Sequence, residues 1–504
     1  MRKESTLTWM NGNVMPSDSS LTHQAVSDRP GPGDRVFHCE RRPETALRFE
    51  TPASRFETMT LRFETAALSC AILLLVMPAF SKSGAEILKV LLLFTWIFSG
   101  CWWKRRERLG RNPLCIVLLI FLGIQFLGVF WSVAPWGTAF RRWFSYNGLW
   151  LLPIVATLLS HRNQKYAAIA CFNIGMIFFF LLANLWRILA PLGLGETGIC
   201  AVSYERYSAY EANASLAVLW LLGCVLLPYP SRRAVGFACL YPRWFRKIIN
   251  RAAHLRCTRL WHRRANKTDW EAKSFYLLRW MLVATIVYYL IYATRSRTAA
   301  VCLVMMAACF PIRTWGLRGV PVSILTPLVL VPCIYCSSPI LRERADAVRR
   351  EWFTLETLYE PGAELEQIAK KNSSGTRIRL FFDALRITAE RPVLGFGTGG
   401  AEIAYERFAD IRGVHDSHCE YTMVLVQWGF VGLALFVGLS TILLFQTGTI
   451  FPPWSDFGFY LTVLIATTCS LWSVFSFGQT EILYPLLLAF VFDMSFPKKR
   501  AGTW

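Results

Sequence analysis

The sequence has 504 residues, of which 54% are hydrophobic and 17% charged, and its formal net charge is +21. Soluble proteins carry roughly 25% charged residues, so this composition excludes an ordinary soluble enzyme and indicates a membrane protein with many spans. Much of the positive charge lies in short stretches between apolar runs. We therefore interpret it as a topology signal, helped by attraction to anionic lipid headgroups, rather than as a sign of a nucleic-acid partner.

The first 65 residues are polar, and we expect them to form a disordered tail. Within them Arg-Phe-Glu-Thr recurs at a constant spacing from Arg48, Arg55 and Arg62. The apolar positions of a coiled coil are not sustained along this repeat, so a short tandem duplication explains it better. Met59 is a second candidate translation start. No cleavable signal peptide is evident, and we expect the first span to remain as an anchor.

The rest of the chain alternates apolar runs with polar connections. A helix needs about 20 mostly apolar residues to cross the bilayer, and by that measure the sequence predicts an all-α polytopic protein with about twelve transmembrane helices. The predicted spans lie near 66–80, 85–103, 114–131, 146–160, 166–186, 212–229, 275–294, 298–312, 320–336, 422–446, 457–475 and 479–496. The domains are therefore a tail (1–65), nine spans within 66–336, a long loop (337–421) and three spans within 422–504.

Short basic loops set the orientation of membrane proteins, since lysine and arginine collect on the cytoplasmic side. An even number of spans places both the basic stretch 230–274 and the basic C-terminal tail in the cytoplasm, which supports the count. The loop 337–421 then faces the periplasm, and we expect it to contain short helices. Aromatic residues interleave with the basic ones in 230–274, so this stretch is either an interfacial amphipathic helix or a solvated loop.

Most of the cysteines fall inside predicted spans, where a thiol behaves as a small apolar residue. Their spacing is not that of a metal site. Cys333, Cys336 and Cys419 lie near the predicted outer face, where pairing as a disulfide is an alternative to free thiols.

Arginines gather on the predicted outer side of the membrane. They are Arg141, Arg142, Arg206, Arg297 and Arg377. Guanidinium groups bind phosphate oxygens in pairs, and fixed cations stabilise the negative charge that develops on a diphosphate leaving group. The sequence therefore predicts a diphosphate-binding site. For Arg297 alone, snorkelling of the side chain to lipid headgroups is the competing interpretation.

His418 lies where the long loop meets the next apolar run, and it is the candidate general base. An imidazole titrates near neutral pH and can take a proton from an acceptor hydroxyl, while Asp416 or Glu420 orients it or competes with it for the proton. The competing interpretation is an interfacial histidine bonded to loop backbone. His415 and His418 have a spacing that suits a metal, but no third ligand is evident, so we predict neither metal nor cofactor.

The segment from Gly395 to Gly400 formally contains a GxGxxG pattern. It follows Pro392 rather than a buried strand, so we interpret it as a tight turn and not as a nucleotide site. In this interpretation Gly395 and Gly397 let the chain double back, so that the helix of Arg377 meets the helix of His418.

These residues resemble the O-antigen ligase and polymerase superfamily of bacterial inner-membrane glycosyltransferases. The resemblance rests on Ser296-Arg297-Thr298, on Thr376-Arg377 with Glu390 to Gly397, and on His418 through Gly432; Trp131 to Pro135 and the stretch around Asn213 add to it. The chain departs from the family at Cys419, where asparagine is usual, and at Phe381, where tryptophan is common.

The resemblance implies a metal-independent enzyme that takes a glycan from undecaprenyl diphosphate at the periplasmic face. In the ligase branch the acceptor is lipid A-core and the anomeric carbon is inverted. Arg377 and Arg297 match the family's diphosphate-binding arginines and His418 its essential histidine, while Arg206 and Arg142 match less closely. In such a mechanism one base activates the acceptor hydroxyl, which attacks opposite a good leaving group. This mechanism requires no nucleophile from the enzyme.

Three functions compete. A ligase is favoured because one outward loop dominates, whereas polymerases often show two. A polymerase of repeat units or a protein O-oligosaccharyltransferase is the second. The third, a transporter of lipid-linked sugar, requires charge at mid-membrane, and Arg187 and Arg279, the near-span charges we identify, both lie close to span ends.

Overall fold

The computed structural model describes residues 52–79, 81–159, 281, 283–288, 290–291, 297–353, 373–414, 417–450, 454–475 and 480–492, with short pieces between 164 and 176. The chain divides into two compact units, Met1–Thr51 and Pro52–Trp504, and every described residue belongs to the second. The described elements are all helices, which confirms an all-α protein. The tail to residue 51, the loop 230–274, Arg187, Arg206, Arg279, His415 and Asp416 lie outside the described residues.

The first described helices are joined by short connections. Helix α1 (Pro52–Leu73) packs against α2 (Lys82–Ser99), and the short α3 (Cys101–Gly110) leads into α4 (Pro113–Leu127). Residue 66, where we expected the first span to begin, therefore lies inside a helix that starts at Pro52. Side chains before α2 and α4 accept the hydrogen bonds of their first turns: Ser81 from the Gly84 amide and Asn112 from the Leu114 amide, both at 3.0 Å.

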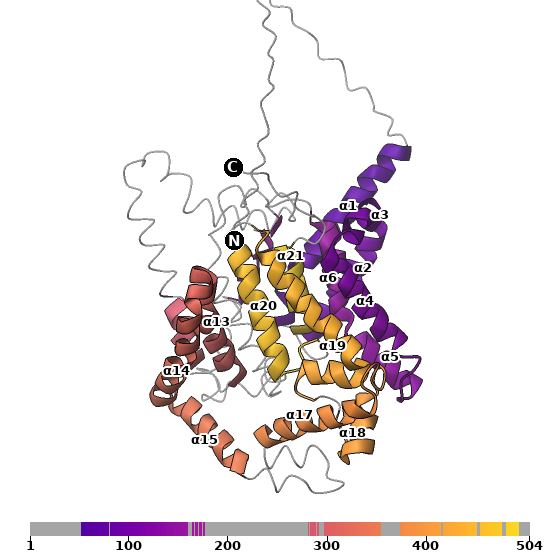
Figure 1. Cartoon of the computed structure of the whole chain (residues 1–504). Coiled ribbons are helices and arrows are strands. Elements are labelled where there is room, and N and C mark those ends of the chain that lie inside the picture. The colour runs from indigo at the N-terminus through magenta and orange to yellow at the C-terminus, as the bar shows by residue number, and fades with distance from the viewer. Residues whose placement is uncertain are drawn as a thin grey trace, which may run out of the picture. The chain divides into compact units, whose positions relative to one another are not determined.

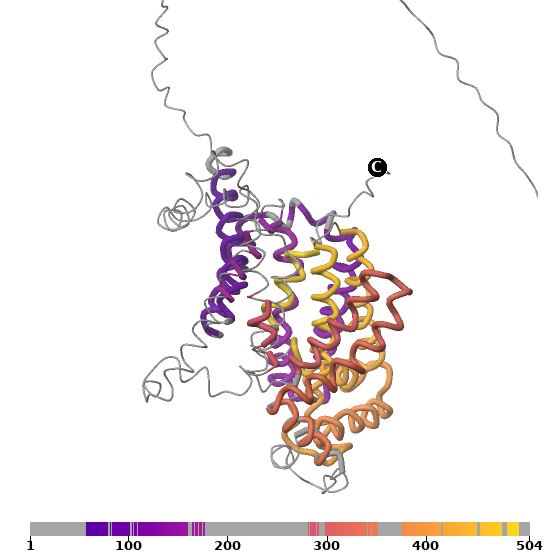
Figure 2. The backbone as a smooth tube through the Cα atoms, turned by 90° about the vertical axis from the view of Figure 1, so that its left-hand side faces the viewer, coloured from indigo at the N-terminus to yellow at the C-terminus, as the bar shows by residue number. Residues whose placement is uncertain are grey.

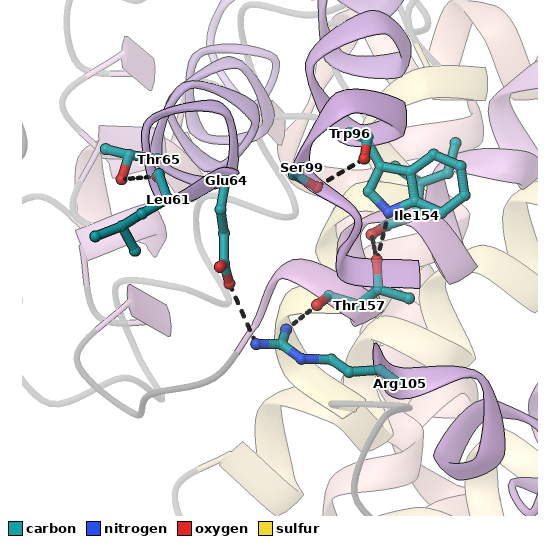
Figure 3. A network of polar contacts seen from close by, with 8 residues as sticks. All are labelled: Leu61, Glu64, Thr65, Trp96, Ser99, Arg105, Ile154 and Thr157. Carbon is teal, nitrogen blue, oxygen red and sulfur yellow. Dashed lines mark hydrogen bonds and ion pairs between the residues drawn. The ribbon is translucent and has the colours of Figure 1, made fainter. Parts of the chain in front are cut away.

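A polar network links four of these helices (Figure 3). Arg105 on α3 pairs with Glu64 on α1, with 3.2 Å between Nη2 and Oε1, and it also donates to the backbone carbonyl of Thr157 on α6 (Leu151–Leu158). The Thr157 hydroxyl accepts from the Trp96 indole of α2 at 2.6 Å. Apolar helices in lipid gain little free energy from burying more apolar surface. Polar links of this kind therefore determine which faces of the helices meet.

Among the described residues, two stretches are long and apolar enough to cross a membrane: Thr298–Ser337 and Glu420–Thr447. The first contains α13 (Arg297–Trp315) and α14 (Val320–Ser337), which pack against each other across a short turn. The Ser323 hydroxyl donates to the Ala308 carbonyl across this pair. The stretch is therefore a helical hairpin, in agreement with two separate predicted spans. The full count of about twelve spans stays a prediction.

The long loop predicted at 337–421 contains helices. They are α15 (Pro339–Phe353), α17 (Ser373–Glu390) and α18 (Ala401–Ala409). After them come α19 (Glu420–Thr447), α20 (Trp454–Leu471) and α21 (Thr480–Phe492). In Figures 1 and 2 the orange helices α17 and α18 lie at one end of the group formed by α19, α20 and α13, and α17 runs across that end. Cys333, Cys336 and Cys419 are free thiols.

Two apolar cores organise the described residues. The larger one joins α1, α2, α4 and α6 to α19, α20 and α21. The smaller one joins α17, the glycine segment and α18 to the start of α19, through Leu380, Phe396, Tyr405 and Val426. The smaller core therefore fixes the helix of Arg377 against the helix that follows His418.

Candidate functional site

His418 adopts an unusual backbone conformation. Its φ is 54°, in the left-handed region that residues other than glycine seldom occupy. Two hydroxyls fix the surrounding turn: Ser417 Oγ donates to the Cys419 carbonyl at 2.9 Å, and Thr422 Oγ1 donates to the same carbonyl at 3.0 Å. Such strain persists only where neighbouring contacts determine it, and it is frequent at functional sites.

The imidazole of His418 packs against the indole of Trp472, with 5.4 Å between ring centroids. Trp472 directly follows the last residue of α20. Aromatic rings at this separation stabilise one another, so Trp472 holds the His418 ring in place. The sequence gives no signal for this partner, because Trp472 is one of 20 tryptophans in the chain.

Glu420, the first residue of α19, is fully buried. Its carboxylate accepts a hydrogen bond from the Tyr146 hydroxyl at 2.8 Å and another from the Phe475 amide at 3.1 Å. It therefore anchors two segments at once: the turn after α5 (Trp136–Ser145) and the segment that carries Trp472.

Arg142 lies on α5, one turn before Tyr146. Its guanidinium carbon is 5.9 Å from the centre of the Tyr146 ring, whose hydroxyl donates to Glu420. The structure thus brings Arg142 and Glu420 into one neighbourhood through a shared tyrosine, and His418 lies two residues before that glutamate.

Arg377 lies near the start of α17 and is half-buried. The helix packs against α19 by a face of fully buried residues, Leu380, Ala384 and Ile387, which meet Met423 and Val426 in the smaller core. Doubling back of the chain, expected from the glycines, is therefore observed: the helix of Arg377 contacts α19, which begins two residues after His418.

Arg297 is the first residue of α13, and its side chain lies outside the described part of the chain. Five residues further along, the Cys302 thiol shares a hydrogen bond with the Thr468 hydroxyl of α20, with 3.6 Å between the two atoms. This contact sets the first turns of α13 beside the end of α20, which is the end that carries Trp472.

The glycine segment is inserted in a break of α19. Gly429 interrupts that helix with φ 61° and ψ −160°. The carbonyls of Val426 and Gln427, which an unbroken helix would pair with residues four positions on, instead accept from Phe396 (3.0 Å) and Gly397 (2.8 Å).

The residues just before the glycine segment also accept hydrogen bonds from α19. The amides of Phe430 and Val431, freed by the same break, donate to the carbonyls of Pro392 and Val393 at 2.8 and 3.3 Å. The segment is a series of turns, as expected, but its pairing with α19 was not foreseen from the sequence.

Gly395 and Gly397 have φ values of 64° and 81°. A Cβ at position 395 would lie 2.6 Å from the Val426 carbonyl, and one at 397 would collide with the backbone of Ser132. Position 397 thus also fixes the turn between α4 and α5, where Ser132 Oγ donates to the Thr398 carbonyl at 2.8 Å. This turn holds the Trp131 to Pro135 sequence, and it joins α5 to the glycine segment.

Two buried side chains of opposite type lie close together within α17. Arg379 and Asp383 are both buried, and their Nε and Oδ2 atoms are 3.4 Å apart. Burial raises the pKa of Asp383, while the neighbouring Arg379 opposes that shift. Within the described ranges, no three His, Cys, Asp or Glu side chains converge as a metal site would require.

Charged residues also lie inside apolar helices, where the sequence reasoning overlooked them. Lys89 of α2 is 2.8 Å from Glu86, 3.3 Å from Glu481 of α21 and 2.7 Å from the Asn147 side-chain oxygen. Arg187 and Arg279 are therefore not the full set of near-span charges. The signal was present, since Lys89 stands within the predicted span 85–103.

Residues 281–437 match the family model described as O-antigen ligase. The match covers about a third of the chain, and it shows that this region is similar to the O-antigen ligase family. No curated protein matched the sequence. The family's members are bacterial inner-membrane proteins and glycosyltransferase-like ligases or polymerases that use lipid-linked glycans. The matched region contains Arg297, Arg377, Gly395, Gly397, His418 and Glu420, whereas Arg142 and Arg206 precede it.

Proposed function

We propose that this chain is a member of the O-antigen ligase superfamily and that it transfers a glycan from undecaprenyl diphosphate to lipid A-core at the periplasmic face of the inner membrane. The observation that carries the proposal is the position of His418, in a strained turn at the start of α19, within the region that matches the family. Glu420 and Trp472 hold that turn and its ring. The arginine-bearing helix α17 packs against α19, and the turn after α5 is hydrogen-bonded to Glu420 at the start of α19.

In the proposed step an acceptor hydroxyl attacks the anomeric carbon while His418 removes its proton. The bond from the acceptor oxygen to the anomeric carbon forms as the bond from that carbon to the phosphate oxygen breaks. The diphosphate leaves with the electron pair, and the guanidinium groups of Arg377, Arg297, Arg206 and Arg142 bind its charge. Attack opposite the leaving group inverts the anomeric carbon, and the cationic side chains take the place of a metal.

Glu420 and Trp472 have distinct parts in this scheme. Trp472 holds the ring of His418 in place as it accepts the proton, since the two rings lie in contact. Glu420 acts as a positioning residue, because its carboxylate holds the segment of Trp472 through the Phe475 amide.

Polymerisation of repeat units is the second candidate, because the family includes both ligases and polymerases. The two share the donor and differ only in the acceptor. A protein O-oligosaccharyltransferase would share the same site chemistry. A transporter of lipid-linked sugar is less consistent with this site. Lys89, a buried charge inside an apolar helix, is paired with Glu86 and Glu481, which leaves little net positive charge for an anion.

The test is a His418→Ala variant in the native host, with membrane insertion confirmed, followed by examination of the extracted lipopolysaccharide. We expect loss of long-chain lipopolysaccharide, with accumulation of lipid-linked glycan. Unchanged long-chain banding would reject the ligase assignment, and retention of single repeat units without extension would indicate a polymerase.

The matched control is Arg412→Ala, which removes a basic residue six positions before His418. Arg412 is exposed and pairs only loosely with the exposed Glu406, at 3.6 Å. Exposed pairs contribute little to stability, so this variant should support normal lipopolysaccharide. A defect of equal size in both variants would point to general disturbance of the loop.

Orientation is tested separately with a protease site inserted after Gly413, an exposed position with open space around it. We expect protease added to spheroplasts to cut the chain there. Cleavage only in inverted vesicles would place the site on the cytoplasmic side and contradict the proposal.

A further inference from the structure

Helix α17 has two apolar faces, and only one is covered by protein. Leu380, Ala384 and Ile387 are fully buried against the smaller core. On the opposite side Phe381, Phe382 and Leu385 are 44%, 57% and 45% exposed. Large apolar side chains grouped on one exposed face of a helix mark an interaction surface rather than contact with water.

The exposed face continues into the turn that follows α17. Val393 and Leu394 are 61% and 47% exposed, and the backbone of this turn is hydrogen-bonded to α19 just after its break at Gly429. Phe430, the next residue of α19, is 58% exposed. Apolar exposure thus extends from α17 to a helix that is apolar enough to cross a membrane.

The position of the break suggests where this surface lies. From Phe430 to Thr447 the helix measures roughly 27 Å at 1.5 Å per residue, close to the thickness of the hydrocarbon core, about 30 Å. Phe430, and the turn bonded to it, would then lie at one boundary of the membrane. Figures 1 and 2 show α17 running across the end of the helix group, as a helix parallel to such a boundary would.

We propose that α17 lies in the membrane interface, with Phe381, Phe382 and Leu385 inserted among the acyl chains of phospholipids. The occupant of this face is the bilayer itself. Polar residues flank the inserted face: Arg386 and Glu390 are exposed on the side next to Phe382, where they reach the headgroup layer. This arrangement is that of an interfacial amphipathic helix.

Arg377 lies close to the inserted face of α17. This residue precedes Phe381 by four positions, so the two side chains are neighbours on one side of the helix, a turn apart. Arg377 lies between the buried face and the inserted face and would sit at headgroup level, where the phosphates of membrane lipids are found. The inference does not depend on the proposed reaction, since it concerns the position of a helix and not a chemical step.

The experiment places the photoreactive residue p-benzoylphenylalanine at position 381, 382 or 385 of the full chain. Each variant is reconstituted in vesicles of phosphatidylethanolamine and phosphatidylglycerol with radiolabelled acyl chains. The control carries the same residue at position 406, where an exposed glutamate on α18 forms a surface pair with Arg412. Elution as a single species in detergent shows that each variant is folded.

We expect positions 381, 382 and 385 to incorporate several-fold more labelled lipid than position 406. Equal labelling at all four positions would overturn the proposal. Adducts between two copies of the chain, in place of lipid adducts, would also overturn it, because the face would then be a protein interface. The experiment measures lipid contact and not glycan transfer. A negative result here therefore leaves the proposed transferase function unaffected, and rejection of the transferase function would leave this inference unaffected.

Discussion

The two halves of α19 differ although the sequence presents them as one apolar run. Every residue from Thr422 to Trp428 is buried in protein. In the second half Phe430, Val437 and Phe445 are 58%, 43% and 78% exposed, as expected of a lipid-facing helix. The first half therefore lies in the candidate site, the second half has the character of a span, and Gly429 separates them.

The difference shows what a helix break can do in a membrane protein. A break in a buried helix frees backbone groups that must find hydrogen bonds elsewhere in the protein. Here the segment from Pro392 to Gly397 supplies them, so the break is also the point at which the long loop is attached to the helix bundle. The following variants test this division of α19.

Gly429→Ala should have the largest effect. Its φ of 61° with ψ of −160° belongs to a region that only glycine readily occupies, and an added Cβ would collide with the Val393 carbonyl. We expect destabilisation by about 3 kcal/mol or more, seen as a lower thermal unfolding midpoint or loss of folded protein in detergent.

The control for this variant is Gly438→Ala in the second half of the same helix. Nothing lies near a Cβ at that position, and alanine favours a helix by up to about 1 kcal/mol relative to glycine. The midpoint should stay the same or rise. Equal destabilisation by both variants would show that the two halves do not differ as described.

Glu420→Ala should come second. It removes the shared acceptor of the Tyr146 hydroxyl and the Phe475 amide, both at a buried site. Buried donors left without an acceptor cost about 2 to 3 kcal/mol in total. Glu420→Gln keeps an acceptor oxygen and should retain more stability in the same unfolding measurement. If the alanine variant matched the wild type, the anchoring role of this carboxylate would be wrong.

Trp428→Phe should have a smaller effect. The Trp428 indole donates to Thr398 Oγ1 at 2.9 Å and is fully buried, so the change removes one hydrogen bond and leaves a small cavity. We expect a loss of about 1 to 2 kcal/mol. Phe430→Leu, at an exposed position of the second half, is the comparison and should change the midpoint very little.

The smallest expected effect is a pH dependence from Asp383, on the helix that covers the first half of α19. Burial raises its pKa in the folded state, so the folded protein binds this proton more tightly than the unfolded chain. Stability from this group is therefore present at low pH and is lost as pH rises from the ordinary aspartate value, about 3.9, through the raised one.

Asp383→Asn removes this titration. We expect the fall in unfolding midpoint between about pH 4 and about pH 7 to be smaller in the variant than in the wild type. The comparison uses the slope with pH, because the variant also changes the pairing with Arg379. An unchanged slope would show that Asp383 does not carry this dependence.

Some features of the molecule follow from sequence patterns and others do not. Hydropathy predicts α13, α14, α19 and α20 because each is a continuous apolar run, and the glycines predict the turns before α18. Hydropathy does not register the break at Gly429, since one glycine barely alters the mean of a long apolar helix. The contact between His418 and Trp472, and the bonds of Glu420, join residues through tertiary packing that no local pattern encodes.

The most direct measurement is made on the purified chain in vesicles that contain undecaprenyl-diphosphate-linked glycan and a lipid A-core acceptor. The account predicts that undecaprenyl diphosphate is released in step with the glycosylated acceptor, in the presence of a chelator, and that His418→Ala abolishes both products while Arg412→Ala does not. Equal rates for the wild type and the His418→Ala variant would contradict it.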